Sequence, residues 1–126
     1  MIRYRYNQQV EPPAPLLHIS LRRPDGSGPA IDSLAQLDTA ADRTAIPARA
    51  VEQLQLVQLR EIPLAGFGGG VALLPTFLVQ AAIHQLQPRA LEVIASPGES
   101  YVLLGRDLLN HFRILLDGPN PIFEIG

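Results

Sequence analysis

The sequence predicts an all-β fold in a single domain. Its short apolar segments are separated by twelve prolines and ten glycines, as turns separate the strands of a β-protein. Several of these segments alternate apolar and polar residues, which is the pattern of strands with one buried face. The length of 126 residues suits one domain with one hydrophobic core. We therefore expect one β-rich domain over residues 1–126.

The first part of the chain contains three expected strands. Apolar and polar side chains alternate over residues 2–6 and again over residues 17–21. The segment 24–29, Pro-Asp-Gly-Ser-Gly-Pro, is a turn by composition, because glycine takes positive φ and aspartate bonds its own backbone. The next strand is expected over residues 33–37. It ends directly before Asp38.

A helix and a long hairpin are expected in the middle of the chain. Residues 47–54 begin with proline and then place three apolar residues at helical spacing, which predicts a short helix. Two apolar segments, residues 56–65 and 71–83, lie on either side of the sequence Gly-Phe-Gly-Gly-Gly at 66–70. This arrangement is the signature of a hairpin with a glycine-rich tip.

The last part of the chain is expected to combine strands with one short helix. The helix opens at Gly105, and Leu108, Leu109 and Phe112 share one of its faces. Asp107 stands in its first turn, where the helix dipole favours a negative charge. The expected strands cover residues 91–95, 101–104, 114–116 and 122–125.

Composition and charge argue against several kinds of function. The net charge is −2, and the ten basic residues are all scattered arginines, so neither nucleic acid nor a membrane surface is an expected partner. Without cysteine, the chain has no disulfide, thiolate metal site or cysteine nucleophile. His18, His84 and His111 lack the spacing of metal ligands, and we expect no metal or cofactor. There is no apolar segment typical of a signal peptide or a membrane span, so we expect a soluble, cytoplasmic protein.

Three segments together resemble the retropepsin-like aspartic protease family. They are residues 34–44 (LAQLDTAADRT), 66–70 (GFGGG) and 102–109 (VLLGRDLL). In that family an apolar strand ends in Asp-Thr-Gly-Ala, a glycine-rich flap follows, and an apolar-apolar-Gly-Arg segment leads into a helix. The resemblance extends from Leu34 to the C-terminus, about three-quarters of the chain. It implies a closed β-barrel with a flap hairpin and one short C-terminal helix.

The resemblance implies a homodimeric aspartic endopeptidase that cuts peptide or protein substrates. This chemistry uses two carboxylates that share one proton, one activating water and the other protonating the carbonyl oxygen. The sequence has a single aspartate in the required motif, Asp38. A second copy related by two-fold symmetry would supply the other. The simpler interpretation of Asp38 is a solvated carboxylate at the end of a strand.

The family motif assigns roles to individual residues of this chain. The catalytic positions are Asp38, Thr39 and Ala40, with the Thr39 hydroxyl turned into the dimer interface. Support of the site falls to Ala41, Asp42, Gly105 and Arg106, and Asp42 and Arg106 are expected to form a buried ion pair. The alternative is that Thr39 is an ordinary strand-end residue and that Asp42 and Arg106 are surface charges. The substrate-binding flap, with Phe67 as its main contact, comprises Gly66, Phe67, Gly68, Gly69 and Gly70.

Ala40 departs from the family, which nearly always has glycine at this position. Its methyl group would project toward the path of the substrate backbone, or it would strain the loop if φ were positive. This departure favours a second function, a catalytically weak or inactive dimeric module for peptide binding or assembly. A third possibility, a plain β-barrel with chance motifs, predicts a monomer.

Overall fold

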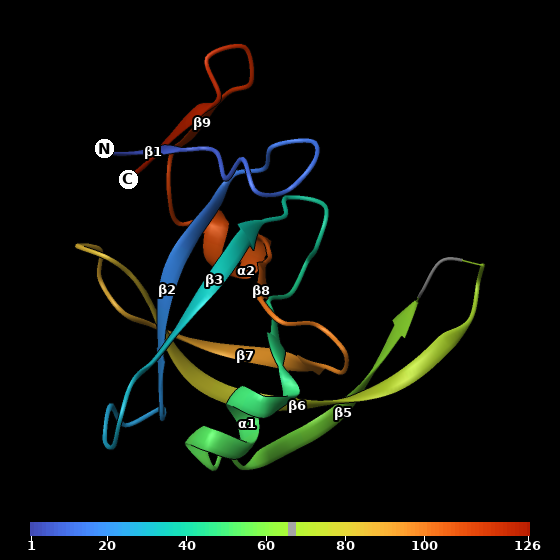
Figure 1. Cartoon of the computed structure of the whole chain (residues 1–126). Coiled ribbons are helices and arrows are strands. Elements are labelled where there is room, and N and C mark those ends of the chain that lie inside the picture. The colour runs from blue at the N-terminus through green and yellow to red at the C-terminus, as the bar shows by residue number, and fades with distance from the viewer. Residues whose placement is uncertain (66–67) are drawn as a thin grey trace.

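The computed structural model describes residues 1–65 and 68–126, and Figure 1 shows the course of the chain. In this part of the chain the elements follow in the order β1 (Ile2–Arg5), β2 (Leu16–Arg22), β3 (Ile31–Leu37), β4 (Ala45–Pro47), α1 (Ala48–Leu54), β5 (Gln58–Ala65), β6 (Val71–Ile83), β7 (Arg89–Ser96), β8 (Val102–Leu104), α2 (Arg106–Leu109), β9 (Ile114–Asp117) and β10 (Ile122–Ile125).

The larger sheet closes into a barrel. Its strands follow the order β2-β3-β8-β4-β7-β6-β5, and β2 also pairs with β6. This extra pairing joins the two sides of the sheet and leaves β5 attached outside the ring. Closure removes most of the free strand edges that an open sheet would expose. The predicted all-β fold and closed barrel are confirmed.

Alternating burial along the strands fills the barrel. In β2, Leu17, Ile19 and Leu21 are at most 2% exposed, whereas His18 between them is exposed. Val79 of β6 and many other apolar side chains join the same cluster. This period of two places one face of each strand in the core.

A smaller sheet, in the order β1-β10-β9, lies beside the barrel. Phe123 of β10 is fully buried, and its ring stacks on that of Tyr4 of β1 with the centroids 5.1 Å apart. Tyr6 packs on the same ring at 6.0 Å and donates a backbone hydrogen bond to the Pro121 carbonyl. The first and last strands of the chain are therefore joined to each other.

Two local features differ from the sequence-based prediction. The strand β4 was not expected, because its three residues are all buried and show no alternation. It pairs in parallel with β7 and also contacts β8. The helix α2 ends at Leu109, so Phe112 lies in the turn beyond it, where its amide donates to the Leu109 carbonyl at 3.1 Å.

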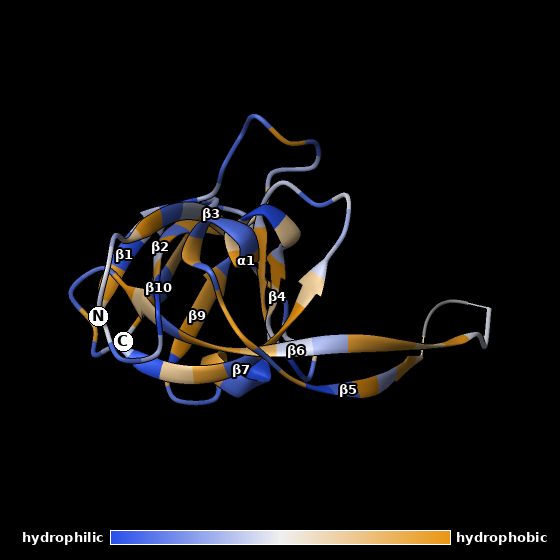
Figure 2. Cartoon of the chain, turned by 90° about the horizontal axis from the view of Figure 1, so that it is seen from below, coloured by the Kyte–Doolittle hydropathy of each residue, from blue (hydrophilic) through white to orange (hydrophobic). Residues whose placement is uncertain are grey.

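Strands β5 and β6 form the expected hairpin, which extends away from the barrel (Figure 2). Their pairing runs as far as Ala65 opposite Val71. Gly68 and Gly69 have φ of 89° and 80°, a conformation that glycine adopts without the steric cost of a side chain. Gly66 and Phe67 lie outside the described residues. In residues 1–65 and 68–126, no helix is long and apolar enough to cross a membrane.

Candidate active site

A parallel strand pair brings two of the sequence motifs together. Strands β3 and β8 run in parallel with Leu37 opposite Leu104, so both end at the same edge of the sheet. Asp38 and Gly105 follow these two residues directly. The Asp38 amide donates to the Leu104 carbonyl at 3.0 Å, which extends the pairing by one residue. The register therefore places the Asp38 turn beside the Gly-Arg segment. The two are far apart in sequence: Thr39, the residue after Asp38, is 67 positions from Arg106.

The Asp38 side chain is fixed by the turn that follows it. It is half-buried, and its Oδ1 accepts a hydrogen bond of 3.1 Å from the Ala40 amide. The Ala41 amide donates to the Asp38 carbonyl at 3.2 Å, which closes the turn. Within the described part of the chain, the Ala40 amide is the one donor bound to this carboxylate. The remaining acceptor positions are free to bind water or a second carboxyl group.

Arg106 holds this turn from the other side. Its Nη1 donates to the Thr39 and Ala40 carbonyls, each at 2.9 Å, and its amide donates to the Ala41 carbonyl at 2.9 Å. The buried ion pair expected between Asp42 and Arg106 does not form among the described residues, and both side chains are exposed. The turn explains this, because its carbonyls have no strand partner and are strong acceptors close to the guanidinium.

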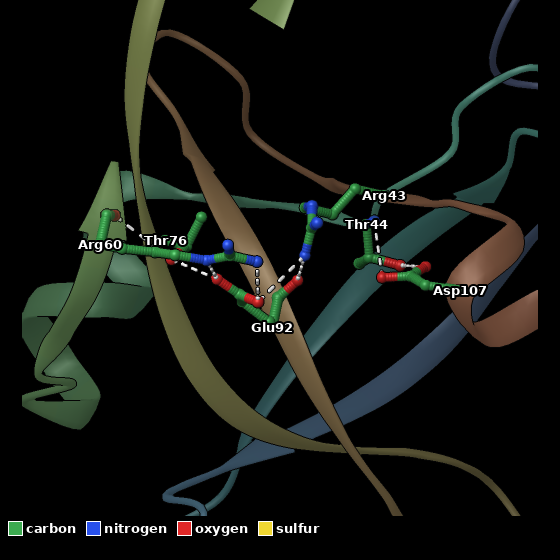
Figure 3. A network of polar contacts seen from close by, with 6 residues as sticks. All are labelled: Arg43, Thr44, Arg60, Thr76, Glu92 and Asp107. Atoms are coloured by element: carbon green, nitrogen blue, oxygen red, sulfur yellow. Dashed lines mark hydrogen bonds and ion pairs between the residues drawn. The ribbon is translucent and has the colours of Figure 1, made fainter. Parts of the chain in front are cut away.

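A pair of residues that the sequence analysis did not single out as a unit, Thr44 and Asp107, anchors the end of the same loop (Figure 3). Thr44 is fully buried; its hydroxyl donates to Asp107 Oδ1 at 2.7 Å, and its amide donates to Oδ2 at 3.0 Å. The hydroxyl also accepts from the Gly105 amide at 3.0 Å, and Asp107 Oδ1 accepts from the Leu108 amide at 2.9 Å. Asp107 does stand in the first turn of α2, as expected, but it also binds the loop.

Gly105 allows the loop and α2 to approach closely. A Cβ at this position would lie 2.6 Å from the Arg43 carbonyl carbon and 2.9 Å from its nitrogen. Real Cβ atoms do not come this close to backbone, so the position has no room for a side chain. Three consecutive residues therefore hold the loop after Asp38. Gly105 lets the backbone of the loop approach, the Arg106 guanidinium binds its carbonyls, and the Asp107 carboxylate binds Thr44.

Ala40 is exposed, and its backbone is not strained. The non-glycine residues with positive φ in the described ranges are Gln55 and Gln85, which excludes the strained conformation considered for Ala40. The steric effect of its methyl group on a substrate stays a prediction. Thr39 is also exposed, and the role of its hydroxyl in a dimer interface stays a prediction as well.

Glu92 of β7 is the centre of a second polar network, which sequence reasoning missed (Figure 3). Its carboxylate accepts two hydrogen bonds from Arg60, at 2.7 and 2.9 Å, and one from the Thr76 hydroxyl at 2.7 Å. Arg43 Nη1 lies 3.4 Å from its Oε1. The hydrogen bonds from Arg60 and then Thr76 lower the pKa of Glu92 to about 2. In the sequence, Glu92 is one polar residue in a strand, and nothing there indicates its partners.

No metal-binding cluster is present in the described residues: no three His, Asp or Glu side chains lie together in an arrangement that could hold an ion.

Comparison with known proteins gives matches among solved structures. No protein-family model and no curated protein matches the sequence. EIAV protease, solved with the inhibitor HBY-793, superposes with a TM-score of 0.56 and 18% identity, over 78% of this chain and 86% of that chain. The simian foamy virus protease gives 0.52 and 17%, over 75% and 92%. A retropepsin-like aspartic protease from Rickettsia conorii gives 0.51 and 18%, over 89% and 92%.

The chain has a retropepsin-like fold. At identities of 17 and 18%, the likeness concerns the course of the backbone and not the activity. The retropepsin-like fold agrees with the motif order seen in the sequence.

Proposed function

We propose that this chain is a homodimeric aspartic endopeptidase in which Asp38 and its symmetry copy share one proton. The observation that carries the proposal is the position of Asp38. It follows the barrel strand β3, and its carboxylate is oriented by the Ala40 amide in a turn that Arg106 holds. The bond to the Ala40 amide alone would suit any aspartate in a turn, as Asp25 shows, but Arg106 of the third motif also holds the carbonyls of this turn. The three similar structures are named as proteases, which agrees with this function.

The chemistry divides between the two carboxyl groups. When the pair holds a single proton, the ionised group takes a proton from a water molecule as that water attacks the peptide carbonyl. The protonated group gives its proton to the carbonyl oxygen. Two carboxylates in contact repel, so one remains protonated into a pH range where an isolated aspartate is ionised. We expect activity at acidic to weakly acidic pH.

The substrate would bind as an extended strand between the β5–β6 hairpin and the paired aspartates. The exposed glycines Gly68, Gly69 and Gly70 leave the backbone of this hairpin accessible. The positive φ of Gly68 and Gly69 favours glycine by itself, whereas an added Cβ at Gly70 would meet nothing within 4 Å, and no positive φ requires glycine there. Close approach of a peptide backbone is a reason for glycine that fits Gly70.

A second copy is required because one chain carries one carboxylate of the pair. We place the contact with the second copy at strand β9, because β9 pairs with β10 on one side and is an outer strand of its sheet. It exposes Leu115 and Leu116, at 50% and 52%. Sedimentation velocity at micromolar concentration should show a dimer, and Leu115→Asp should shift it toward monomer. A monomer at every concentration, with or without a peptide inhibitor, would contradict the dimer.

Ala40 supports a second candidate, a dimeric peptide-binding module with weak or no activity. A mixed peptide pool at acidic pH separates the two functions. Hydrolysis by the wild type that a statine-type inhibitor blocks, and that Asp38→Asn lacks, supports the endopeptidase. Peptides that are retained by the wild type but left intact at every acidic pH would support the binding module.

A further inference from the structure

Glu92 stands where three segments of the proposed active site meet (Figure 3). Arg60 reaches it from β5, and the Thr76 hydroxyl reaches it from β6. These two strands form the hairpin. The third segment is the loop after Asp38: Arg43 Nη1 donates to the Glu92 carbonyl at 3.0 Å and lies 3.4 Å from its Oε1. One side chain therefore contacts both the hairpin and the loop that carries Asp38.

Strand register explains why this position makes the connection. Arg60 is opposite Thr76, and Thr76 is opposite Ile94 of β7. Glu92 is two residues from Ile94, so it projects from the same face of the sheet and lies diagonal to Thr76. Thr76 is fully buried, and its hydroxyl has one proton to donate. The 2.7 Å contact to Glu92 is shorter than the 3.3 Å contact to the Arg60 carbonyl and is the stronger of the two.

The loop after Asp38 is attached to β7 by two neighbouring residues, Arg43 and Thr44. Arg43 reaches Glu92 with its side chain, while its backbone is packed against Gly105. The carbonyl of the next residue, Thr44, accepts a hydrogen bond of 3.1 Å from the Ile94 amide of β7. A shift of β7 relative to the hairpin would therefore reach the loop through two contacts, the Arg43 side chain on Glu92 and the Thr44 carbonyl on the Ile94 amide.

We propose that Glu92 is a positioning residue that sets the distance between the substrate-binding hairpin and the Asp38 carboxylate. The inference rests on the proposed function, since it concerns the same site. Substrate would be held by the hairpin backbone, whereas Asp38 belongs to the loop. Their separation controls how the peptide carbonyl meets the carboxyl pair, and displacements of about 1 Å at a reacting centre can reduce rates about a hundredfold.

The charge of Glu92 persists under the conditions in which the aspartate pair would work. Hydrogen bonds from Arg60 and Thr76 hold the pKa of Glu92 at about 2, below its ordinary value of 4.5. The network stays ionised at weakly acidic pH, so it would not loosen where a carboxyl pair holds one proton.

Two glutamine variants test this role. Glu92→Gln keeps the shape of the side chain and removes its charge. Glu124→Gln is the matched control, because Glu124 is 23% exposed against 22% for Glu92 and also pairs with an arginine on the neighbouring strand, Arg3. The full-length variants are compared by hydrogen–deuterium exchange and by steady-state hydrolysis of a peptide that the wild type cleaves, after sedimentation has shown equal dimer fractions.

In Glu92→Gln we expect amide exchange to increase at least about threefold both in the hairpin and in residues 39–44, with β2 unchanged. We expect kcat to fall about tenfold with KM within about twofold, because the hairpin still binds substrate but presents it less accurately. Glu124→Gln should change neither quantity. Arg60→Met should reproduce the faster exchange in the hairpin and leave the loop unchanged, because Arg43 keeps its contacts to Glu92.

Wild-type exchange in both segments of Glu92→Gln, or equal effects in Glu92→Gln and Glu124→Gln, would overturn the inference. If Glu92 only stabilised the fold, Glu92→Gln would have a lower melting temperature but an unchanged kcat at temperatures below the unfolding transition. That result would also overturn the inference. If the wild type cleaves no peptide, the proposed function fails, but the exchange measurement still decides whether Glu92 couples the hairpin to the loop.

Discussion

The Thr44 hydroxyl donates a hydrogen bond of 2.7 Å to Asp107 Oδ1, across 63 positions of sequence. This bond joins the end of the Asp38 loop to the first turn of α2. Because Thr44 is fully buried, its hydroxyl has no access to water if the partner is removed. The geometry of the loop therefore depends on a contact outside the motif that contains Asp38.

Thr44→Val should reduce the free energy of unfolding by about 1–3 kcal/mol. Valine has nearly the same shape, but it leaves the Gly105 amide without its acceptor and Asp107 Oδ1 with the Leu108 amide as its remaining donor. Urea denaturation of Thr44→Val, Asp107→Ala and the double variant measures the coupling between the two residues, because each single substitution removes the hydrogen bond. Losses that add without any coupling would show that the 2.7 Å contact contributes nothing by itself.

Arg106→Ala should cost about 1–2 kcal/mol, because the Thr39 and Ala40 carbonyls lose their donor. Asp42→Ala is the informative companion variant, and we expect a change within about 0.5 kcal/mol because Asp42 is exposed. A buried ion pair would behave differently, since removing either partner of such a pair costs about 3–5 kcal/mol. A large loss in Asp42→Ala, measured by thermal or urea denaturation, would restore the ion pair and contradict the arrangement described above.

Periodicity and composition were sufficient to predict most of the strands, the hairpin and the position of Asp38 at the end of β3. The three-residue strand β4 was not predicted, because all of its residues are buried and it therefore shows no alternation of apolar and polar side chains. The partners of Glu92 and Thr44 depend on which strands are neighbours and in which register, and the sequence does not contain that information. The Asp42–Arg106 ion pair, which the family resemblance implied, was wrong for a related reason. The turn has carbonyls without a strand partner, and these bind the guanidinium instead.

Ala40→Gly should increase kcat/KM and slightly lower stability. The backbone of Ala40 lies outside the positive-φ region, so glycine relieves no strain. It adds freedom to the unfolded chain and should cost about 0.4–1 kcal/mol. Removing the methyl group clears the path of the substrate backbone, which raises the rate if that group crowds the peptide. Lower kcat/KM in Ala40→Gly would mean that the substrate channel is adapted to alanine.

The stability difference between the wild type and Glu92→Gln should depend on pH. The pKa of Glu92 is about 2 in the folded chain, and we take its ordinary value of 4.5 for the unfolded chain. The ionised carboxylate therefore stabilises the fold fully above pH 4.5. The effect is lost as the pH falls from there through about 2. Asp25 and Asp117 also have lowered pKa values, from hydrogen bonds of Ser27 and Asn120, but they titrate in both proteins and cancel in the difference. If denaturation gave the same difference in unfolding free energy between wild type and Glu92→Gln at pH 7 and at pH 2, the lowered pKa of Glu92 would be contradicted.

The activity of mixtures of wild type and Asp38→Asn tests most directly whether two copies form one site. The substitution removes the carboxylate while keeping the hydrogen-bonding shape of the side chain, and a mixed dimer would carry a single aspartate. After subunit exchange at fixed wild-type concentration, hydrolysis per wild-type chain should fall to about one half with equal amounts of variant and to about one quarter with a threefold excess, as random pairing in a two-fold dimer requires. Activity per wild-type chain that is unaffected by the variant, or an Asp38→Asn protein that is itself active, would contradict the shared site.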